Sequence, residues 1–284
     1  MVNLFSETEK QMVRVERVQQ YLEDTPQEKF TREEGVTPEW PEKGSIIFEN
    51  VSFKYRDGLP LALNGLNFEI KGGEKVGICG RTGSGKSTLL KVLFNIVDIS
   101  EGCVYIDGTA TCEVGNSVLR SRMSIIPQDP FLFDDTVAKN LDPMGEYAAQ
   151  EINDVLEKCH LTKQIHALGG LGGEVGEKGN NLSVGQKQLV CLARALLKRS
   201  TIICIDEATA SVDMDTDRLI QETIREAFVD STVLTIAHRI NTIMECDRVF
   251  VMERGAVVET GSPHQLLTDN TSHFYALVYQ SSSN

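Results

Sequence analysis

The sequence predicts an α/β fold whose main sheet is largely parallel. A strand-like segment at 75–79 is followed by a helical run from Ser87 to Phe94 and by strands near 104–106 and 124–126. A strand, turn, helix, strand order is typical of a parallel sheet with crossover helices. Two apolar segments, 201–205 and 232–236, add buried strands to this prediction.

The other elements follow in chain order. A charged helix with a thin apolar stripe is predicted over 1–24, and a Pro-rich linker over 25–44. Alternating apolar residues on both sides of a turn at 57–60 predict antiparallel strands at the start of one large domain, 45–284. Residues 134–200 are expected to form a helical subdomain, and a hairpin is predicted around 253–255.

Composition excludes several classes of function. The 284 residues carry a formal charge of −13 and have a pI near 4.9, which disfavours a nucleic-acid partner because phosphate neutralisation needs a basic face. No apolar run approaches the roughly 20 residues of a membrane-spanning helix, and the first residues do not resemble a signal peptide. Seven scattered cysteines predict reduced core residues rather than disulfides or a zinc site.

A phosphate-binding motif occupies the turn between the strand at 75–79 and the helix after it. It reads Gly80-Arg81-Thr82-Gly83-Ser84-Gly85-Lys86-Ser87 and has the GxxxxGK[ST] pattern. Backbone N–H groups of residues 82–87 and the helix N-terminus favour phosphates, the Lys86 side chain adds a charge, and the Ser87 hydroxyl suits Mg²⁺. We assign Thr88 to the same set. The alternative, a chance Gly/Ser-rich turn, is disfavoured by the flanking strand and helix.

A second motif is the apolar strand that ends in Asp206 and Glu207. A buried strand of this kind delivers Asp206 to a metal ion, while Glu207 is positioned to activate the water that attacks a γ-phosphate. An acidic cap at a strand end is common by itself. Together with the first motif, it predicts a P-loop nucleotidase.

A third motif indicates which kind of P-loop nucleotidase this chain is. Leu182-Ser183-Val184-Gly185-Gln186 precedes a helical run, so that Ser183 and Gly185 lie at a helix N-terminus. This segment resembles the LSGGQ signature of ATP-binding-cassette (ABC) proteins. In that family two cassettes pack head to tail, and the signature of one, here residues 183–186, closes over the ATP held by the other. The resemblance therefore implies a second cassette as partner, and ATP with Mg²⁺ as ligands.

The remaining motifs of the family occur in the expected order. Tyr55 matches the aromatic that stacks on adenine, Gln128 matches the glutamine that senses metal and γ-phosphate, 210–213 matches the D-loop, and His238 matches the switch histidine. Alone, Tyr55 and His238 are more typical of packing residues. Their roles are implied by the resemblance, which makes Glu207, His238 and Gln128 catalytic and Ser87, Gln128 and Asp206 metal-binding.

The resemblance covers nearly the whole chain and is closest to the C-terminal cassette of the C subfamily, the multidrug resistance-associated proteins, with stretches similar to the protein 7 type. Supporting segments include 140–143, 188–197 and 235–243. It implies a P-loop NTPase cassette with a RecA-like, mainly parallel core, an antiparallel β subdomain and an α-helical signature subdomain. The first helix resembles the segment that leaves the last transmembrane helix, which implies exporter membrane domains as partners and the cytoplasmic face of a membrane as location.

One departure concerns Val184, which replaces a glycine of LSGGQ. The resemblance implies that a C-terminal cassette of this subfamily contributes consensus residues to the competent ATP site and a variant signature to the weak one. Because a β-branched residue restricts the backbone, the strength of the ATP site that this signature completes is left open by the sequence. The leading hypothesis is an ATP hydrolase that powers export of organic solutes. The alternatives are a regulatory cassette that binds ATP without hydrolysis, a truncated copy without a partner, and a soluble ABC ATPase acting on ribosomes or DNA, which the acidic charge disfavours.

Overall fold

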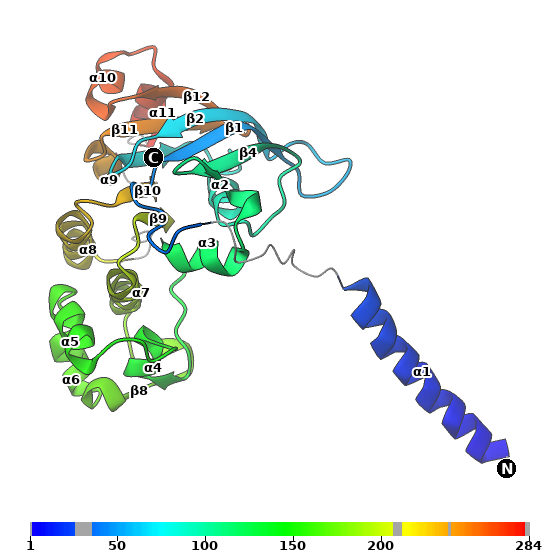
Figure 1. The fold of residues 1–284 in the computed structure, drawn as a ribbon. Coiled ribbons are helices and arrows are strands. Elements are labelled where there is room, and N and C mark those ends of the chain that lie inside the picture. The colour runs from blue at the N-terminus through cyan, green and yellow to red at the C-terminus, as the bar shows by residue number, and fades with distance from the viewer. Residues whose placement is uncertain (1, 26–35, 207–211, 238–239, 282–284) are drawn as a thin grey trace. The chain divides into compact units, whose positions relative to one another are not determined.

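The computed structural model describes residues 2–25, 36–206, 212–237 and 240–281 (Figure 1). The chain divides into two compact units, residues 1–31 and residues 32–284. The first contains helix α1, Val2–Asp24, which is the predicted N-terminal helix. Its described side chains from Glu7 onward are all exposed, Tyr21 and Leu22 among them. None of the helices described combines the length and the apolar character that crossing a bilayer requires.

The main sheet of the second unit is largely parallel, as predicted. Within the described residues its strand order is β12-β11-β3-β10-β9-β6. All neighbouring pairs are parallel except the β11–β12 hairpin. The strands are β3 (Lys75–Cys79), β6 (Met123–Ile126), β9 (Ile202–Asp206), β10 (Thr232–Ile236), β11 (Arg248–Glu253) and β12 (Ala256–Gly261).

A second, antiparallel sheet has the order β2-β1-β4-β5 in the described part of the chain. Its strands are β1 (Ile46–Phe53), β2 (Leu63–Ile70), β4 (Glu101–Ile106) and β5 (Thr109–Ala110). The strand order of the sequence suggested that the segment near 104–106 follows the first crossover helix back into the parallel sheet. Instead Val104 pairs with Phe48, and both side chains are buried. The parallel neighbours of β3 are β10 and β11, which come more than 150 residues later.

The helical part of the unit lies between β6 and β9 in the chain. Its elements are β7 (Asp135–Thr136), α4 (Val137–Leu141), α5 (Ala149–Lys158), α6 (Thr162–Ala167), η2 (Gly170–Gly172), β8 (Glu174–Val175), η3 (Glu177–Gly179) and α7 (Val184–Lys198). In Figure 1, α4, α5 and α6 gather at one end, and α7 lies between them and the main sheet. Helix α7 contacts β6, α4, α5 and α8. Apolar residues such as Leu189 and Leu192 are accordingly buried on it.

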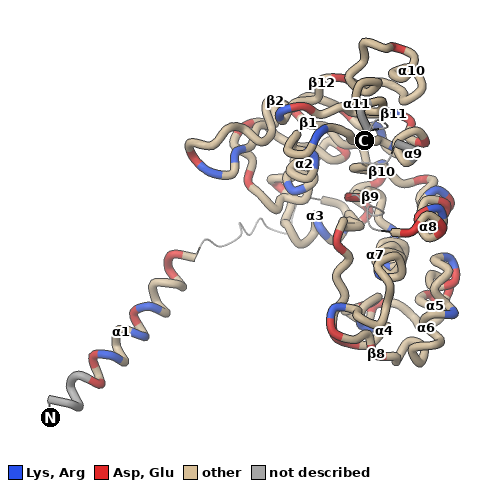
Figure 2. The backbone as a smooth tube through the Cα atoms, turned by 180° about the vertical axis from the view of Figure 1, so that it is seen from behind, with Lys and Arg blue, Asp and Glu red and all other residues tan. Residues whose placement is uncertain are grey.

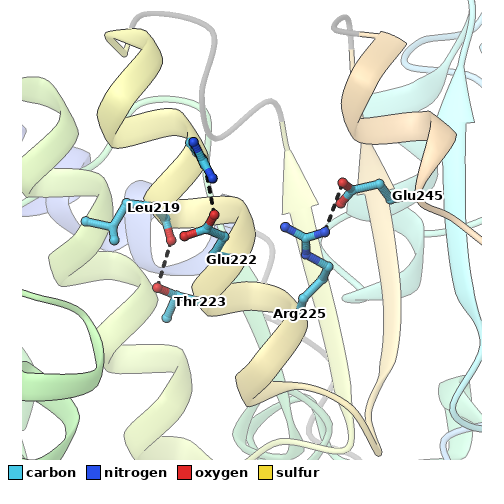
Figure 3. Close-up of polar contacts among 6 residues, drawn as sticks. Leu219, Glu222, Thr223, Arg225 and Glu245 are labelled. Carbon is cyan, nitrogen blue, oxygen red and sulfur yellow. Dashed lines mark hydrogen bonds and ion pairs between the residues drawn. The ribbon is translucent and has the colours of Figure 1, made fainter.

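The remaining helices cover the two sheets. They are α2 (Lys86–Leu93), η1 (Thr111–Glu113), α3 (Asn116–Arg122), α8 (Met214–Ala227), α9 (Ile240–Met244), α10 (Pro263–Thr268) and α11 (His273–Ser281). Figure 3 shows α8 joined to the segment after α9 by an ion pair between Arg225 and Glu245, at 3.1 Å. Both side chains are about half exposed, so this pair adds little stability. In Figure 2, acidic and basic residues are interspersed along both α1 and α8.

The segment 36–44, which the sequence analysis assigns to the linker, contacts the antiparallel sheet. Trp40 is buried in the same apolar cluster as Ile46 and Phe48, and its indole N–H donates to the carbonyl of Ile106 at 3.1 Å. Thr201 donates its hydroxyl to the carbonyl of Pro41. The average composition of 25–44 is polar, and such an average does not reveal the buried Trp40 that anchors the described residues 36–44.

Asp107, in the β4–β5 turn, holds the end of the same segment. Its carboxylate accepts hydrogen bonds from the N–H groups of Lys43, Gly44 and Ser45 and from the Ser45 hydroxyl. Burial raises the pKa of Asp107, but these donors together lower it by more, so that the pKa lies below its ordinary value. The charged carboxylate therefore stabilises the fold.

Replacing Asp107 with asparagine should lower the free energy of unfolding by about 1–3 kcal/mol at pH 7, the range for hydrogen bonds to a charged group. Because the folded-state pKa is lowered, this stabilisation exists above the unfolded-state pKa of about 4 and is lost as the pH falls through the folded-state pKa. Urea titrations at pH 7 and pH 3 should show a smaller difference between wild type and Asp107→Asn at pH 3. The control Asp98→Asn, at an exposed position, should change the free energy of unfolding little at either pH. An equal loss of stability in Asp107→Asn at both pH values would contradict the role of the Asp107 charge.

Candidate functional site

The phosphate-binding motif forms the predicted turn between β3 and α2. Strand β3 ends at Cys79 and α2 begins at Lys86. The Lys86 side chain is buried, and its Nζ donates to the carbonyls of Gly80 at 2.9 Å and Arg81 at 3.2 Å. These contacts hold the ammonium group over the loop rather than toward bulk solvent. The positive end of α2 and this ammonium group make the turn attractive to an anion.

Two features of the loop fit a bound phosphate. Ser84 is 4% exposed, and its Oγ is a buried polar atom without a hydrogen-bond partner among the described residues. Gly85 has φ of 104°, and a Cβ there would lie 2.6 Å from the carbonyl oxygen of Ala62. A side chain at 85 would therefore displace the loop from the antiparallel sheet. The donor set and the tight backbone both suit the triphosphate that the motif implies.

Tyr55 lies beside this loop. Its hydroxyl forms a 3.0 Å hydrogen bond with the hydroxyl of Thr88 in α2, and the Lys91 ammonium group lies 5.6 Å from the ring centroid. The Phe53 ring packs edge-on against it. The Tyr55 side chain is still 50% exposed. The structure thus fixes an aromatic ring next to Thr88, a position consistent with the predicted stacking on a base.

The other predicted residues follow the ends of neighbouring parallel strands. Asp206 is the last residue of β9 and lies opposite Ile236 of β10, which in turn lies opposite Ile78 of β3. On the other side of β9, Ile126 of β6 pairs with Ile205, so that Gln128 follows two residues beyond the same sheet edge. The carboxyl ends of parallel strands meet at one edge, where α/β proteins bind ligands.

This register brings Asp206, Gln128 and the phosphate-binding loop to a common edge. Asp206 is half-buried, whereas Gln128 and Ser87 are exposed. Carboxylate, amide and hydroxyl oxygens are ligands suited to Mg²⁺. The remaining two catalytic predictions, Glu207 and His238, lie outside the described residues, as do residues 210 and 211 of the D-loop. Of that loop, Asp213 caps α8 by accepting a hydrogen bond from the N–H of Thr216.

The predicted signature lies at the N-terminus of α7. The Ser183 hydroxyl accepts from the Gln186 N–H at 3.2 Å, and the Gln186 side chain accepts from the Ser183 N–H at 2.9 Å. This capping box fixes the first turn of α7. Gly185 is buried, and a Cβ there would lie 2.7 Å from the side chain of Thr216 in α8. Val184 is 45% exposed, so the residue that departs from LSGGQ is accessible.

Sequence reasoning missed two residues that tie the signature helix to the segment containing Gln128. Gln188, which is 2% exposed, donates its amide to the carbonyls of Pro127 at 3.0 Å and Gln128 at 2.9 Å. Arg194, two turns further along α7, donates to the carbonyls of Phe131 and Asn140. The sequence signal that could have found Gln188 and Arg194 is their position as the two polar residues in the otherwise apolar run 188–197. Their partners are backbone atoms, which no side-chain pattern reveals.

Comparison with known proteins identifies the family. The family model described as ABC transporter matches residues 63–210. This range contains the phosphate-binding loop, the Gln128 segment, the signature and Asp206. The chain belongs to the ABC transporter family. The resemblance inferred from the motifs is thereby confirmed.

Similar proteins belong to subfamily C, as expected for this ABC cassette. Over 99% of its length the chain is 48% identical to ATP-binding cassette sub-family C member 10 of Mus musculus, covering 19% of that protein. Over 98% of its length it is 49% identical to Metal resistance protein YCF1 of Saccharomyces cerevisiae, covering 18% of it. The chain thus spans about a fifth of the length of these relatives.

A solved structure confirms the fold class of the ABC cassette. The chain superimposes on a structure described as a bacterial Atm1-family ABC exporter with ATP bound, with a TM-score of 0.79 and 34% sequence identity. The match covers 85% of this chain and 42% of that one. The α/β architecture with a largely parallel core, an antiparallel sheet and a helical segment is therefore the ABC cassette fold.

Proposed function

We propose that this chain is an ATP-binding and ATP-hydrolysing cassette that powers export of organic solutes across a membrane. The main support is the strand register, which brings the Lys86 loop, Asp206 and Gln128 to one edge of the parallel sheet. Membership of the ABC transporter family supports the same assignment.

In the proposed mechanism, the loop of residues 80–87 binds the β- and γ-phosphates. The backbone N–H groups of 82–87 and the ammonium group of Lys86 would orient the triphosphate, and Tyr55 would stack on adenine. Ser87, Gln128 and Asp206 would hold Mg²⁺, which when bound neutralises phosphate charge. The Glu207 carboxylate would accept a proton from the attacking water, and His238 would donate a hydrogen bond to the γ-phosphate.

The partners belong to the same proposal. A second cassette would pack head to tail, so that the 183–186 turn closes over the ATP held by that partner. Val184, which is exposed at this turn, is β-branched and replaces a glycine of the signature, so the site it completes would be the weaker of the two. The membrane domains of an exporter would join the cassette at the cytoplasmic face of the membrane. The length of the relatives, about five times that of the chain, accommodates such domains.

Replacing Lys86 with methionine tests the nucleotide-binding step. The variant keeps a long apolar stem but loses the charge over the loop, so we expect Mg-ATP to bind about 10- to 100-fold more weakly, which corresponds to a lost charge-assisted hydrogen bond. The measurement is a calorimetric titration of the chain with Mg-ATP. The control, Lys163→Met, changes an exposed lysine of α6 and should bind like wild type. Equal affinity of Lys86→Met and wild type would exclude the loop as the phosphate site.

A further inference from the structure

Two of the seven cysteines, both outside the predicted nucleotide-binding motifs, lie next to each other. Cys103 is on β4 and Cys112 is in η1, and their sulfur atoms are 4.0 Å apart. The expectation that the cysteines are core residues is wrong for this pair, since Cys112 is exposed and Cys103 only partly buried. The separation is about twice the 2.05 Å length of a disulfide bond. Forming the bond requires the two sulfur atoms to approach by about 2 Å.

The β4–β5 hairpin explains why the two residues meet. Strands β4 and β5 pair Tyr105 with Ala110 and Ile106 with Thr109, around a turn at Asp107-Gly108 in which both residues have positive φ. Positive φ at both positions is the geometry of a two-residue hairpin turn. Strand β5 ends at Ala110, and the chain continues into η1, which contacts β4 and brings Cys112 beside Cys103.

Both backbones are held in place by other contacts. Cys103 lies opposite Glu49 in the β1–β4 ladder. Next to Cys112, the buried residue Thr111 accepts a hydrogen bond at its carbonyl from the side chain of Asn95, at 2.8 Å. The proximity of the two thiols is therefore a property of the antiparallel sheet and of the loop packed against it.

We propose that Cys103 and Cys112 form a reversible intramolecular disulfide in response to a peroxide. The exposed Cys112 thiol is oxidised first: the peroxide transfers an oxygen to sulfur, giving a sulfenic acid and one water. The Cys103 sulfur then attacks the Cys112 sulfur, the S–S bond forms, and the hydroxyl leaves with the Cys103 proton as a second water. Two equivalents of a low-molecular-weight thiol restore both cysteines by exchange.

The neighbouring chemistry favours this order of events. Cys112 is exposed whereas Cys103 is partly buried, so that Cys112 is the thiol that meets the oxidant. Burial and the adjacent Cys112 also raise the pKa of Cys103, which keeps Cys103 protonated and slow to react with the oxidant itself. Burial also raises the pKa of Cys79 and of Cys159 to about 12, which keeps these thiols protonated and unreactive. Because the disulfide closes the hairpin that carries Asp107, it would stiffen the attachment of residues 43–45.

Peptide mapping of the wild-type chain tests the proposal without any substitution. Trypsin cleaves after Lys91 and Arg120, so both cysteines fall in the single peptide 92–120, which contains no others. After peroxide treatment and alkylation, we expect this peptide to carry no alkyl group and to be about 2 Da lighter than its reduced form. Further cleavage before Asp107 should leave two fragments joined by the disulfide. Prior treatment with a thiol reductant should restore two alkylation sites.

Two variants provide controls. In Cys103→Ser, the Cys112 sulfenic acid has no neighbouring thiol and should be trapped by a 1,3-dione reagent, whereas wild type should give little adduct. Cys246→Ser, which removes a partly buried cysteine elsewhere, should form the disulfide like wild type. The proposal is overturned if peptide 92–120 of the oxidised wild-type chain takes two alkyl groups, or if Cys112 proceeds to sulfinic acid while Cys103 stays alkylatable. Either result would leave the proposed ATPase function unaffected.

Discussion

Replacing Glu207 with glutamine should abolish ATP hydrolysis while leaving ATP bound. Glutamine keeps the size and the hydrogen-bonding reach of the side chain but cannot accept a proton from water. General-base catalysis contributes about 10²- to 10⁴-fold to the rate, and we expect phosphate release to fall by that factor. The adjacent Asp206, at the end of β9, remains in place as the metal ligand of the proposed mechanism.

The measurement is steady-state phosphate release by a dimer that contains the chain, together with Mg-ATP affinity. Glu226→Gln, an exposed substitution on α8, is the matched control and should hydrolyse ATP at the wild-type rate. Undiminished turnover in Glu207→Gln would remove Glu207 from the mechanism. Absence of phosphate release by the wild-type dimer, with ATP bound, would instead favour the regulatory cassette.

Replacing Trp40 with alanine should destabilise the cassette by about 3–5 kcal/mol, the cost of removing a large buried aromatic side chain. Trp40 is 6% exposed, packs with the apolar cluster of the antiparallel sheet, and donates its indole N–H to Ile106. The substitution leaves a cavity and removes the hydrogen bond from the indole to the Ile106 carbonyl. Its effect should appear as a lower urea midpoint followed by circular dichroism, since Trp40 is the only tryptophan of the chain.

Two further variants separate packing from a general effect of substitution. Trp40→Phe keeps most of the apolar volume and loses only the hydrogen bond, so about 1–2 kcal/mol should be lost. Glu39→Ala, at an exposed neighbouring position, should cost less than about 0.5 kcal/mol. A Trp40→Ala chain as stable as wild type would show that the segment 36–44 acts as a linker after all.

Prediction from sequence succeeds for local features of this chain and fails for contacts between distant segments, of which the burial of Trp40 is one. Motifs of fixed spacing, such as 80–87 and 182–186, depend on local backbone geometry, and the structure places both at the helix N-termini expected from them. Strand pairing over long distances is not local. The pattern of segment 104–106 predicts a strand but does not say whether the strand joins the parallel or the antiparallel sheet. Its pairing with Phe48 assigns it to the antiparallel sheet.

In the candidate site, too, the residues of local motifs could be predicted from the sequence, whereas contacts made by long-range packing could not. Tyr55, Gln128 and Asp206 were found from motif order, and the described residues bring the last two to the sheet edge that carries Lys86. Glu207 and His238 stay predictions from sequence. Gln188 was missed because its partners are carbonyl groups of Pro127 and Gln128, which become neighbours only when α7 packs near β6.

The strand order of the main sheet also has a consequence for biosynthesis. Strand β3 lies between β10 and β11, which end at Ile236 and Glu253. A ribosome makes the chain from its N-terminus, so the strand that supports Lys86 emerges long before either neighbour exists. Pairings of such sequence separation form slowly, and an unpaired strand edge is prone to aggregation until they do. The predicted nucleotide site would therefore be complete only late in translation, and a nascent chain interrupted before residue 253 would expose β3 to chaperones and proteases.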